Sequence, residues 1–237
     1  MTFRLFIKLL IAPLPSGMLR VLYRTLFGYR IGPRVRIGLS VIDADRCFIE
    51  EDASIGHFNL LVGTKTLNIR DHARVGHFNV IRGGDEVSLG RYSEVIRFNE
   101  INSIPDPDVV NEIDPRFILG DGSIVVASHK IDFTDRVTLG KRVILGGRNS
   151  SLWTHNRQMT RPITIGDFAY VGSEIRIAPG GEVPARCVVG IGSVITKKLE
   201  GEDNLIAGVP AKVIHPLGEE GLFLTEYKTR KDLPDDL

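Results

Sequence analysis

The chain has 237 residues, of which 43% are hydrophobic and 25% charged, and its formal net charge at pH 7 is +1. This length allows one sizeable core, and the near-zero net charge lacks the basic excess of a polyanion-binding protein, so we expect no nucleic-acid partner. The two cysteines, Cys47 and Cys187, are too few for a disulfide framework and too isolated for a zinc site, so a cytoplasmic setting is expected.

The first 30 residues differ in character from the rest. No acidic residue precedes Asp43, whereas the same stretch holds these basic residues: Arg4, Lys8, Arg20, Arg24, Arg30, Arg34 and Arg36. The apolar run at positions 3–12 is shorter than the roughly 20 apolar residues that span a bilayer, and no small-residue cleavage site follows it, so a signal peptide is not expected. Residues 18–27 have apolar side chains at helical spacing.

We therefore expect residues 1–30 to form a basic amphipathic helical segment. Two interpretations of this segment remain open. Its apolar face packs on the end of the main domain, or the segment rests on an anionic membrane surface, which would place the protein at the inner face of the membrane.

A repeat of six residues organises the rest of the chain. The residues at this spacing are all β-branched and aliphatic: Ile165, Val171, Ile177, Val183, Val189 and Ile195. A period of six fits neither a 3.6-residue helix nor a simple alternating strand. It fits short strands joined by tight turns, each repeat placing one branched residue inward, so that stacked repeats bury a continuous column.

Earlier segments follow the same pattern less regularly, as in the near copies 55–60 and 75–80, which both contain Gly-His-Phe-Asn. The repeat domain is predicted to run over 31–214. A Pro- and Asp-rich stretch breaks the period, which predicts a loop excursion at about 103–117. The polar residues 215–237 are expected to form a loosely docked C-terminal tail.

Three stretches, Ile165–Ser173, Val189–Lys197 and Ala207–Ile214, resemble the C-terminal signature of the hexapeptide-repeat acyltransferases, in particular the galactoside and maltose O-acetyltransferase group. The resemblance implies a left-handed parallel β-helix with three hexapeptides per turn. It also implies a homotrimer with active sites between subunits. The implied reaction transfers acetyl from acetyl-CoA to a hydroxyl of a sugar or cell-surface glycan precursor, as in polysaccharide biosynthesis.

Such a transfer needs a base to take the proton of the acceptor, and histidine suits this role because its ordinary pKa lies near neutrality. The resemblance assigns the base to His155, which precedes the segment Pro162–Gly166. His129 lies in a region that resembles the strand from which relatives place a polar residue beside the acceptor, so it is the second candidate. The two roles are exchangeable at this stage. Asp132 or Asn156 could hold the imidazole tautomer.

The same resemblance suggests which residues contact the CoA. Ser173 corresponds to a serine near the thioester or pantetheine, and Ile191, Thr196 and Lys197 fall on the stretch that borders the pantetheine and nucleotide. Lys212 is a candidate partner for the CoA phosphates, as a flexible point charge. The alternative for both lysines is a solvated turn.

Other interpretations compete with this one. His72 and His77 have the His-x4-His spacing found in γ-class carbonic anhydrases of the same fold, but no third ligand is evident, so no metal is expected. The repetition of His57 and His77 indicates a shared structural environment. An amino-sugar N-acetyltransferase and a non-catalytic β-helix scaffold remain as alternative functions.

Overall fold

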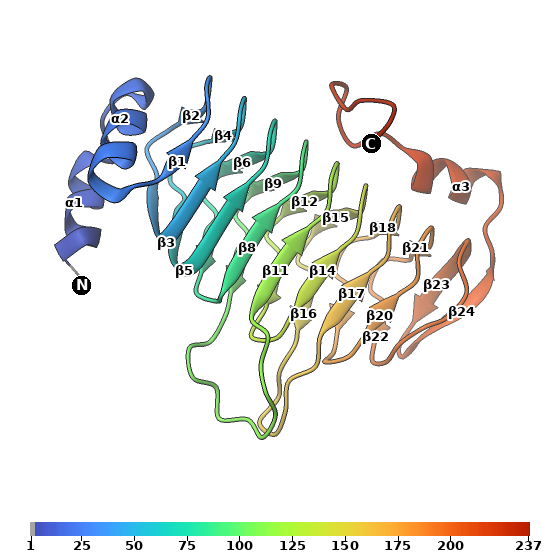
Figure 1. Ribbon diagram of the computed structural model, residues 1–237. Coiled ribbons are helices and arrows are strands. Elements are labelled where there is room, and N and C mark those ends of the chain that lie inside the picture. Colours follow the sequence, from blue (N-terminus) through green and yellow to red (C-terminus); the bar gives the residue numbers. More distant parts are fainter. Residues whose placement is uncertain (1–2) are drawn as a thin grey trace.

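The computed structural model describes residues 3–237, and most of that range lies in one parallel β-helix (Figure 1). The predicted left-handed parallel β-helix is confirmed, with about nine turns in the described chain. Each turn places short strands on three faces, which we call face 1, face 2 and face 3. The first strand lies on face 3, and from there the chain repeats the order face 1, face 2, face 3.

Face 1 consists of β2 (Arg36–Ile37), β4 (Ser54–Ile55), β6 (Arg74–His77), β9 (Glu94–Arg97), β12 (Ile124–Ala127), β15 (Ile144–Arg148), β18 (Tyr170–Val171), β21 (Val188–Val189), β23 (Asn204–Gly208) and the antiparallel β24 (Ala211–Pro216). Face 2 consists of the first halves of β3 (Val41–Ile49) and β5 (Leu60–Ile69), then β7 (Val80–Arg82), β10 (Glu100–Asn102), β13 (Lys130–Asp132), β16 (Ser151–Trp153), β19 (Arg176–Ile177) and β22 (Val194–Ile195). Face 3 consists of β1 (Arg30–Ile31), the second halves of β3 and β5, then β8 (Glu86–Leu89), β11 (Arg116–Leu119), β14 (Val137–Leu139), β17 (Ile163–Ile165) and β20 (Glu182–Val183).

The six-residue column predicted from the sequence forms the core of the C-terminal turns. Its members visit the three faces in rotation, and each is at most 2% exposed: Ile165, Val171, Ile177, Val183, Val189 and Ile195. Fully burying such a side chain contributes about 1.5–3 kcal/mol. The earlier turns are less regular because face 3 is wider there. Leu67 and Ile69, for example, both point inward from one strand.

The repeated Gly-His-Phe-Asn segments form a ladder at the corner between faces 1 and 2. The backbone N–H of Asn79 donates to Oδ1 of Asn59 (2.9 Å), and that of Asn99 donates to Oδ1 of Asn79 (3.0 Å). All three asparagines are buried. Outside them, the rings of Phe58, Phe78 and Phe98 stack with centroids 5.0 Å apart. The repeated asparagine therefore supplies a hydrogen-bond acceptor for a buried backbone N–H group at this corner in each turn.

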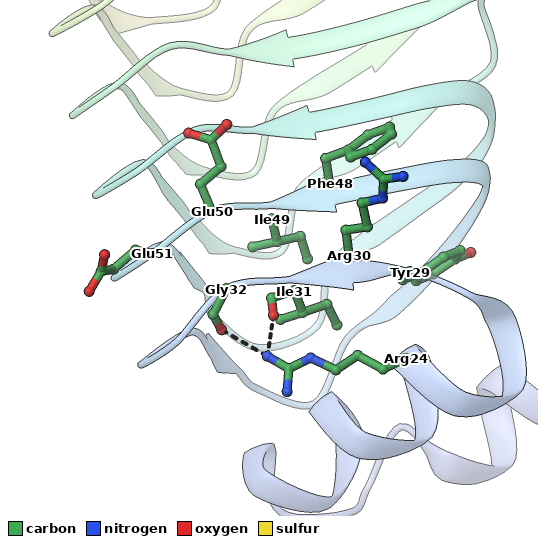
Figure 2. Close-up of a pocket in the computed structure, with 9 residues that line it drawn as sticks. All are labelled: Arg24, Tyr29, Arg30, Ile31, Gly32, Phe48, Ile49, Glu50 and Glu51. Carbon is green, nitrogen blue, oxygen red and sulfur yellow. Dashed lines mark hydrogen bonds between the residues drawn. The ribbon is translucent and has the colours of Figure 1, made fainter.

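Helices α1 (Phe3–Ile11) and α2 (Ser16–Phe27) close the N-terminal end of the β-helix. Lys8 is fully buried, with Nζ 2.7 Å from the Tyr29 hydroxyl and 2.5 Å from Oδ1 of Asp43. Arg24 of α2 donates hydrogen bonds to the carbonyls of Ile31 and Gly32, beside a cavity of about 530 Å³ (Figure 2). The segment thus packs on the end of the β-helix. No helix within residues 3–237 is long and apolar enough to cross a membrane.

The C-terminal tail is held more closely than the sequence predicts. After α3 (Glu219–Glu226) the chain runs back over the corner between faces 3 and 1 (Figure 1). Arg230 is 7% exposed and donates to the carbonyls of His72 (2.8 Å) and Tyr92 (3.3 Å). Asp232 forms an ion pair with Arg74 at 2.8 Å. The tail also buries one apolar side chain, Leu233, which is 4% exposed. The polar composition concealed this docking, since most of it consists of hydrogen bonds and ion pairs.

Candidate active site

Two insertions leave the β-helix at the same corner, between faces 2 and 3. Residues 103–115 connect β10 to β11, and residues 154–162 connect β16 to β17; they lie together at the bottom of Figure 1. The two segments are joined by hydrogen bonds from the Val110 N–H to the Gln158 carbonyl (3.0 Å) and from the Thr160 N–H to Oδ1 of Asn111 (2.9 Å). They form a wall beside face 2.

His155 is the second residue of the second insertion, separated from β16 by Thr154 alone. Its Nδ1 is 2.7 Å from Oδ2 of Asp132, which ends β13 on the preceding turn. The two come together because parallel register pairs Asp132 with Trp153, two residues before the histidine. Of the two residues that the sequence offers for holding the tautomer, Asp132 contacts the ring. Asn156 instead accepts from the N–H groups of Gln158 and Met159 within the insertion.

Asp132 is fixed by the chain around it. Its Oδ2 also accepts from the Thr154 N–H (2.9 Å) and hydroxyl (2.7 Å), and its Oδ1 accepts from the Thr134 hydroxyl (2.6 Å). The residue is only 5% exposed. A carboxylate held in this way accepts the Nδ1–H of His155, so that Nε2 is the nitrogen left to take a proton.

The His155 side chain is 23% exposed and borders two cavities. One, of about 230 Å³, has a lining that includes Arg82, Asn102, Asp132 and Trp153. The other, of about 550 Å³, lies against the two insertions. An imidazole oriented by a buried carboxylate and opening on a cavity has the geometry of a general base.

His129 occupies a different environment. It is fully buried, its N–H donates to Oδ1 of Asn99 (3.0 Å), and its Nδ1 accepts from the Ser150 N–H (3.1 Å). It thus continues the asparagine ladder, and it does not line either cavity beside His155. Burial lowers the pKa of His129 to about 4.

This burial predicts an acid-sensitive stability. An unfolded histidine takes up a proton below its ordinary pKa of about 6.5, whereas the folded His129 stays neutral down to about pH 4. The contribution of His129 to the free energy of unfolding is therefore complete above the pKa of the unfolded histidine. It is lost as the pH falls below that pKa, by about 2 kcal/mol between pH 8 and pH 5. Urea unfolding at these pH values should show that His129→Asn reduces this loss. If the free energy of unfolding of the variant depends on pH as that of the wild type does, His129 is not the cause of the acid sensitivity.

The predicted CoA-contacting residues lie on other parts of the β-helix. Ser173 and Ile191 occupy equivalent corner positions on successive turns between faces 1 and 2, where the Gly192 N–H donates to the Ser173 carbonyl (3.1 Å). Ile191 is 73% exposed. Lys212 is exposed in the terminal hairpin, opposite Ala207. Within one chain, these residues are therefore separated from His155 by the width of face 2.

Thr196 is the exception among the CoA candidates. It follows Ile195 on face 2, in the row in which Trp153 follows Leu152 and Ala178 follows Ile177. Thr196 lies two turns from Trp153, toward the C-terminal end, and Lys197 is exposed beside it.

The two histidines of the alternative metal site, His72 and His77, make separate ring contacts. The ring of His72 stacks on Tyr92 (4.5 Å), and that of His77 stacks on His57 (5.6 Å). Among the residues that the structure describes, no group of three potential ligands is present.

Sequence reasoning missed the residues that support the histidine. Thr154 and Thr134 orient Asp132, and Asn102 and Arg82 line the cavity. A signal was present for the last two, because Arg82, Asn102 and Asp132 each directly follow an inward aliphatic residue of face 2.

No family model matches the chain. It is 26% identical over 115 residues to the galactoside O-acetyltransferase of Escherichia coli K12, a match that spans 46% of this chain and 56% of that protein. It is 34% identical over 67 residues to a Saccharomyces cerevisiae protein provisionally named an acetyltransferase, spanning 28% of this chain and 34% of that one. The matches thus cover little more than half of one curated relative and a third of the other.

Among solved structures, the UDP-N-acetylglucosamine acyltransferase from Campylobacter jejuni superposes with a TM-score of 0.53 at 20% identity, covering 82% of this chain and 76% of that one. At this identity the likeness concerns the fold. Together with the sequence relatives, it confirms the resemblance predicted from the sequence, which is to the hexapeptide-repeat acyltransferases.

Proposed function

We propose that this protein is an acyltransferase that moves acetyl from acetyl-CoA to a hydroxyl of a sugar or cell-surface glycan precursor, as in polysaccharide biosynthesis. The observation that carries the proposal is the pairing of His155 with Asp132, 2.7 Å apart, beside two cavities. The names of the sequence relatives support acetyl as the transferred group.

In the proposed reaction, Nε2 of His155 takes the proton of the acceptor hydroxyl while the hydroxyl oxygen bonds to the thioester carbonyl carbon. The tetrahedral intermediate collapses, the carbon–sulfur bond breaks, and the electron pair leaves with the CoA sulfur. Protonated His155 returns the proton to that thiolate. Asp132 stabilises the imidazolium by accepting from Nδ1–H throughout. The acetyl group passes directly to the acceptor, without an acyl-enzyme.

The donor site in this proposal needs a second subunit. Ser173 and Ile191 lie at a corner away from His155 in their own chain, so a homotrimer would bring them to the His155 of a neighbour. Ser173 and nearby backbone N–H groups then stabilise the oxyanion. Thr196 borders the pantetheine, and Lys197 and Lys212 face the CoA phosphates.

The direct test is acceptor-dependent release of CoA. Purified protein is incubated with acetyl-CoA and matched sugars and amino sugars, and the product is analysed for an ester or an amide. Ester formation supports the proposal, whereas amide formation alone would indicate the N-acetyltransferase. No acetyl-CoA binding and no release with any acceptor would leave the scaffold interpretation and overturn the proposal.

We also propose that α1 and α2 dock on an anionic membrane surface, which would place the enzyme where lipid-linked glycans are assembled. Although one side of these helices packs on the β-helix, the other exposes large apolar side chains, among them Phe3 (78%), Leu10 (63%) and Leu26 (57%). Arg4 and Arg24 are exposed on the same helices. Apolar side chains flanked by cations suit the interface of an anionic bilayer.

Vesicle sedimentation tests this docking. The protein should sediment with vesicles that contain phosphatidylglycerol and stay in solution with pure phosphatidylcholine, and added salt should weaken the binding. Phe6→Ser combined with Leu10→Ser should abolish it, because both side chains are exposed on α1. Phe223→Ser, a matched exposed change on α3, is the control. Equal sedimentation of the two variants would contradict the docking.

A further inference from the structure

The cavity beside His155 has a neighbour toward the N-terminal end of the β-helix. It shares Arg82 and Ile104 with a cavity of about 600 Å³ that lies against the first insertion. Glycines at positions 63, 83 and 84 line the second cavity. A Cβ at Gly84 would lie 2.3 Å from the ring of Phe133, so this position admits no side chain unless the ring moves. We call the two cavities together the corner groove.

A row of outward side chains on face 2 connects the groove to the histidine. Parallel register pairs Arg82 with Asn102, Asn102 with Asp132, and Asp132 with Trp153. Since neighbouring strands are about 4.8 Å apart, Asn102 lies one spacing and Arg82 about 10 Å from Asp132. Thr196 lies in the same row on the opposite side of Trp153. Thr196 and the corner groove therefore lie on opposite sides of Trp153 along this row.

Asn102 supplies the first sign of a ligand. Its Oδ1 is buried and has no hydrogen-bond partner among the described residues. A buried polar atom without a partner costs about 1–3 kcal/mol, so such atoms are rare in folded proteins. Asn102 lines the cavity that His155 borders, and a turn of its side chain would bring Oδ1 to the cavity, where a hydroxyl or amide of a bound acceptor could donate to it.

Arg82 supplies the second sign. Its side chain is exposed, lines both cavities, and has no ion pair or side-chain hydrogen bond in the chain from residue 3 to 237. The other basic side chains of the groove have acidic neighbours, namely Lys65 with Asp85 at 2.7 Å and Lys130 with Glu100 at 4.0 Å. Asp106, on the insertion opposite, lies beyond ion-pair distance of Arg82. A free guanidinium of this kind binds carboxylates and phosphates through paired hydrogen bonds.

We propose, on the basis of the function proposed above, that the acceptor lies lengthwise in the corner groove and that Arg82 binds an anionic group of it, a carboxylate or phosphate. The anionic group is carried on the part of the acceptor that lies beyond Asn102, toward Arg82, two strand spacings or about 10 Å from Asp132 along the row. The acceptor is then an acidic glycan or a phosphate-linked sugar rather than a simple neutral sugar, and Asn102 binds it between the two ends.

Three probes test the charge. Digalacturonic acid carries carboxylates, its dimethyl ester has the same hydroxyls without charge, and UDP-galactose carries phosphates. The wild-type protein should use one charged probe with a kcat/KM about 10- to 100-fold above that of the ester, through a lower KM. Arg82→Ala should remove this advantage, and Arg82→Lys should keep part of it. Which charged probe is preferred distinguishes carboxylate from phosphate.

Arg97→Ala is the matched control, because Arg97 is an exposed strand arginine on face 1 and lines neither cavity. Binding of the probes to the inactive His155→Ala protein, by calorimetry, gives a readout without turnover. If the protein acetylates the dimethyl ester and the two charged probes at equal rates, and Arg82→Ala does not change these rates, this inference is overturned while the proposed function stands. If the protein binds the charged probes selectively and Arg82→Ala loses this binding, but no probe is acetylated, the proposed function is overturned and the anion-binding role of Arg82 is supported. Absence of charge-selective binding to the His155→Ala protein would also overturn the inference.

Discussion

Replacing His155 with alanine is expected to lower kcat for acetyl transfer by about 10²- to 10⁴-fold, the contribution of a general base. The change removes the imidazole that Asp132 orients at 2.7 Å and leaves the β-helix intact, since His155 stands on an insertion outside the core. Acetyl-CoA affinity should change little. Steady-state CoA release, with acetyl-CoA binding measured separately, checks the split between kcat and affinity.

His129→Asn is the matched histidine control for this prediction. Asparagine extends the ladder of Asn59, Asn79 and Asn99, so the variant should fold and keep transfer within about twofold of wild type. Full activity in His155→Ala together with loss in His129→Asn would reverse the two roles, an alternative that the sequence left open.

Phe133→Ala should cause the largest loss of stability, about 3–5 kcal/mol in the free energy of unfolding. The ring is fully buried, directly after Asp132, and its centroid lies 6.2 Å from that of Phe117. It also fills the space above Gly84, so its removal leaves a cavity beneath the corner groove. Urea unfolding measures the free energy, and the melting temperature should fall by about 10 °C.

Two further variants serve as comparisons for the stability loss expected in Phe133→Ala. Phe133→Leu keeps most of the volume and should cost clearly less than the alanine change. Phe223→Ala, at a side chain that is 64% exposed, should change stability by no more than about 0.5 kcal/mol. A Phe133→Ala protein that unfolds at the wild-type urea concentration would show that the ring is not part of the core.

The fold could be predicted well where one short rule governs the chain. The spacing from Ile165 to Ile195 is set by the constant lengths of strand and corner. The position of an aliphatic residue in the six-residue repeat therefore predicts that it is buried. The rule weakens before Ile163 because face 3 places two residues inward per strand, as with Leu67 and Ile69, and a strict period of six then misses a residue pair.

The candidate site was predicted only in part because it depends on register between turns of unequal length. His155 and Asp132 are 23 residues apart in sequence, and the first insertion makes the preceding turn longer still. A motif identifies the histidine, but only the pairing of β13 with β16 brings the carboxylate beneath it. Arg82 and Asn102 belong to no motif, and their relation to the site follows from the strand register alone.

The docking of the C-terminal tail has a consequence for synthesis on the ribosome. Arg230 binds the carbonyl of His72, which is 158 residues earlier in the chain. At about 5–20 residues per second, the N-terminal turns emerge roughly 8–30 seconds before the segment that covers their corner. During that interval the nascent β-helix carries an uncovered corner around His72 and Tyr92. This corner is therefore covered only after the turns beneath it have been made, even though the turns themselves can stack in the order in which they emerge.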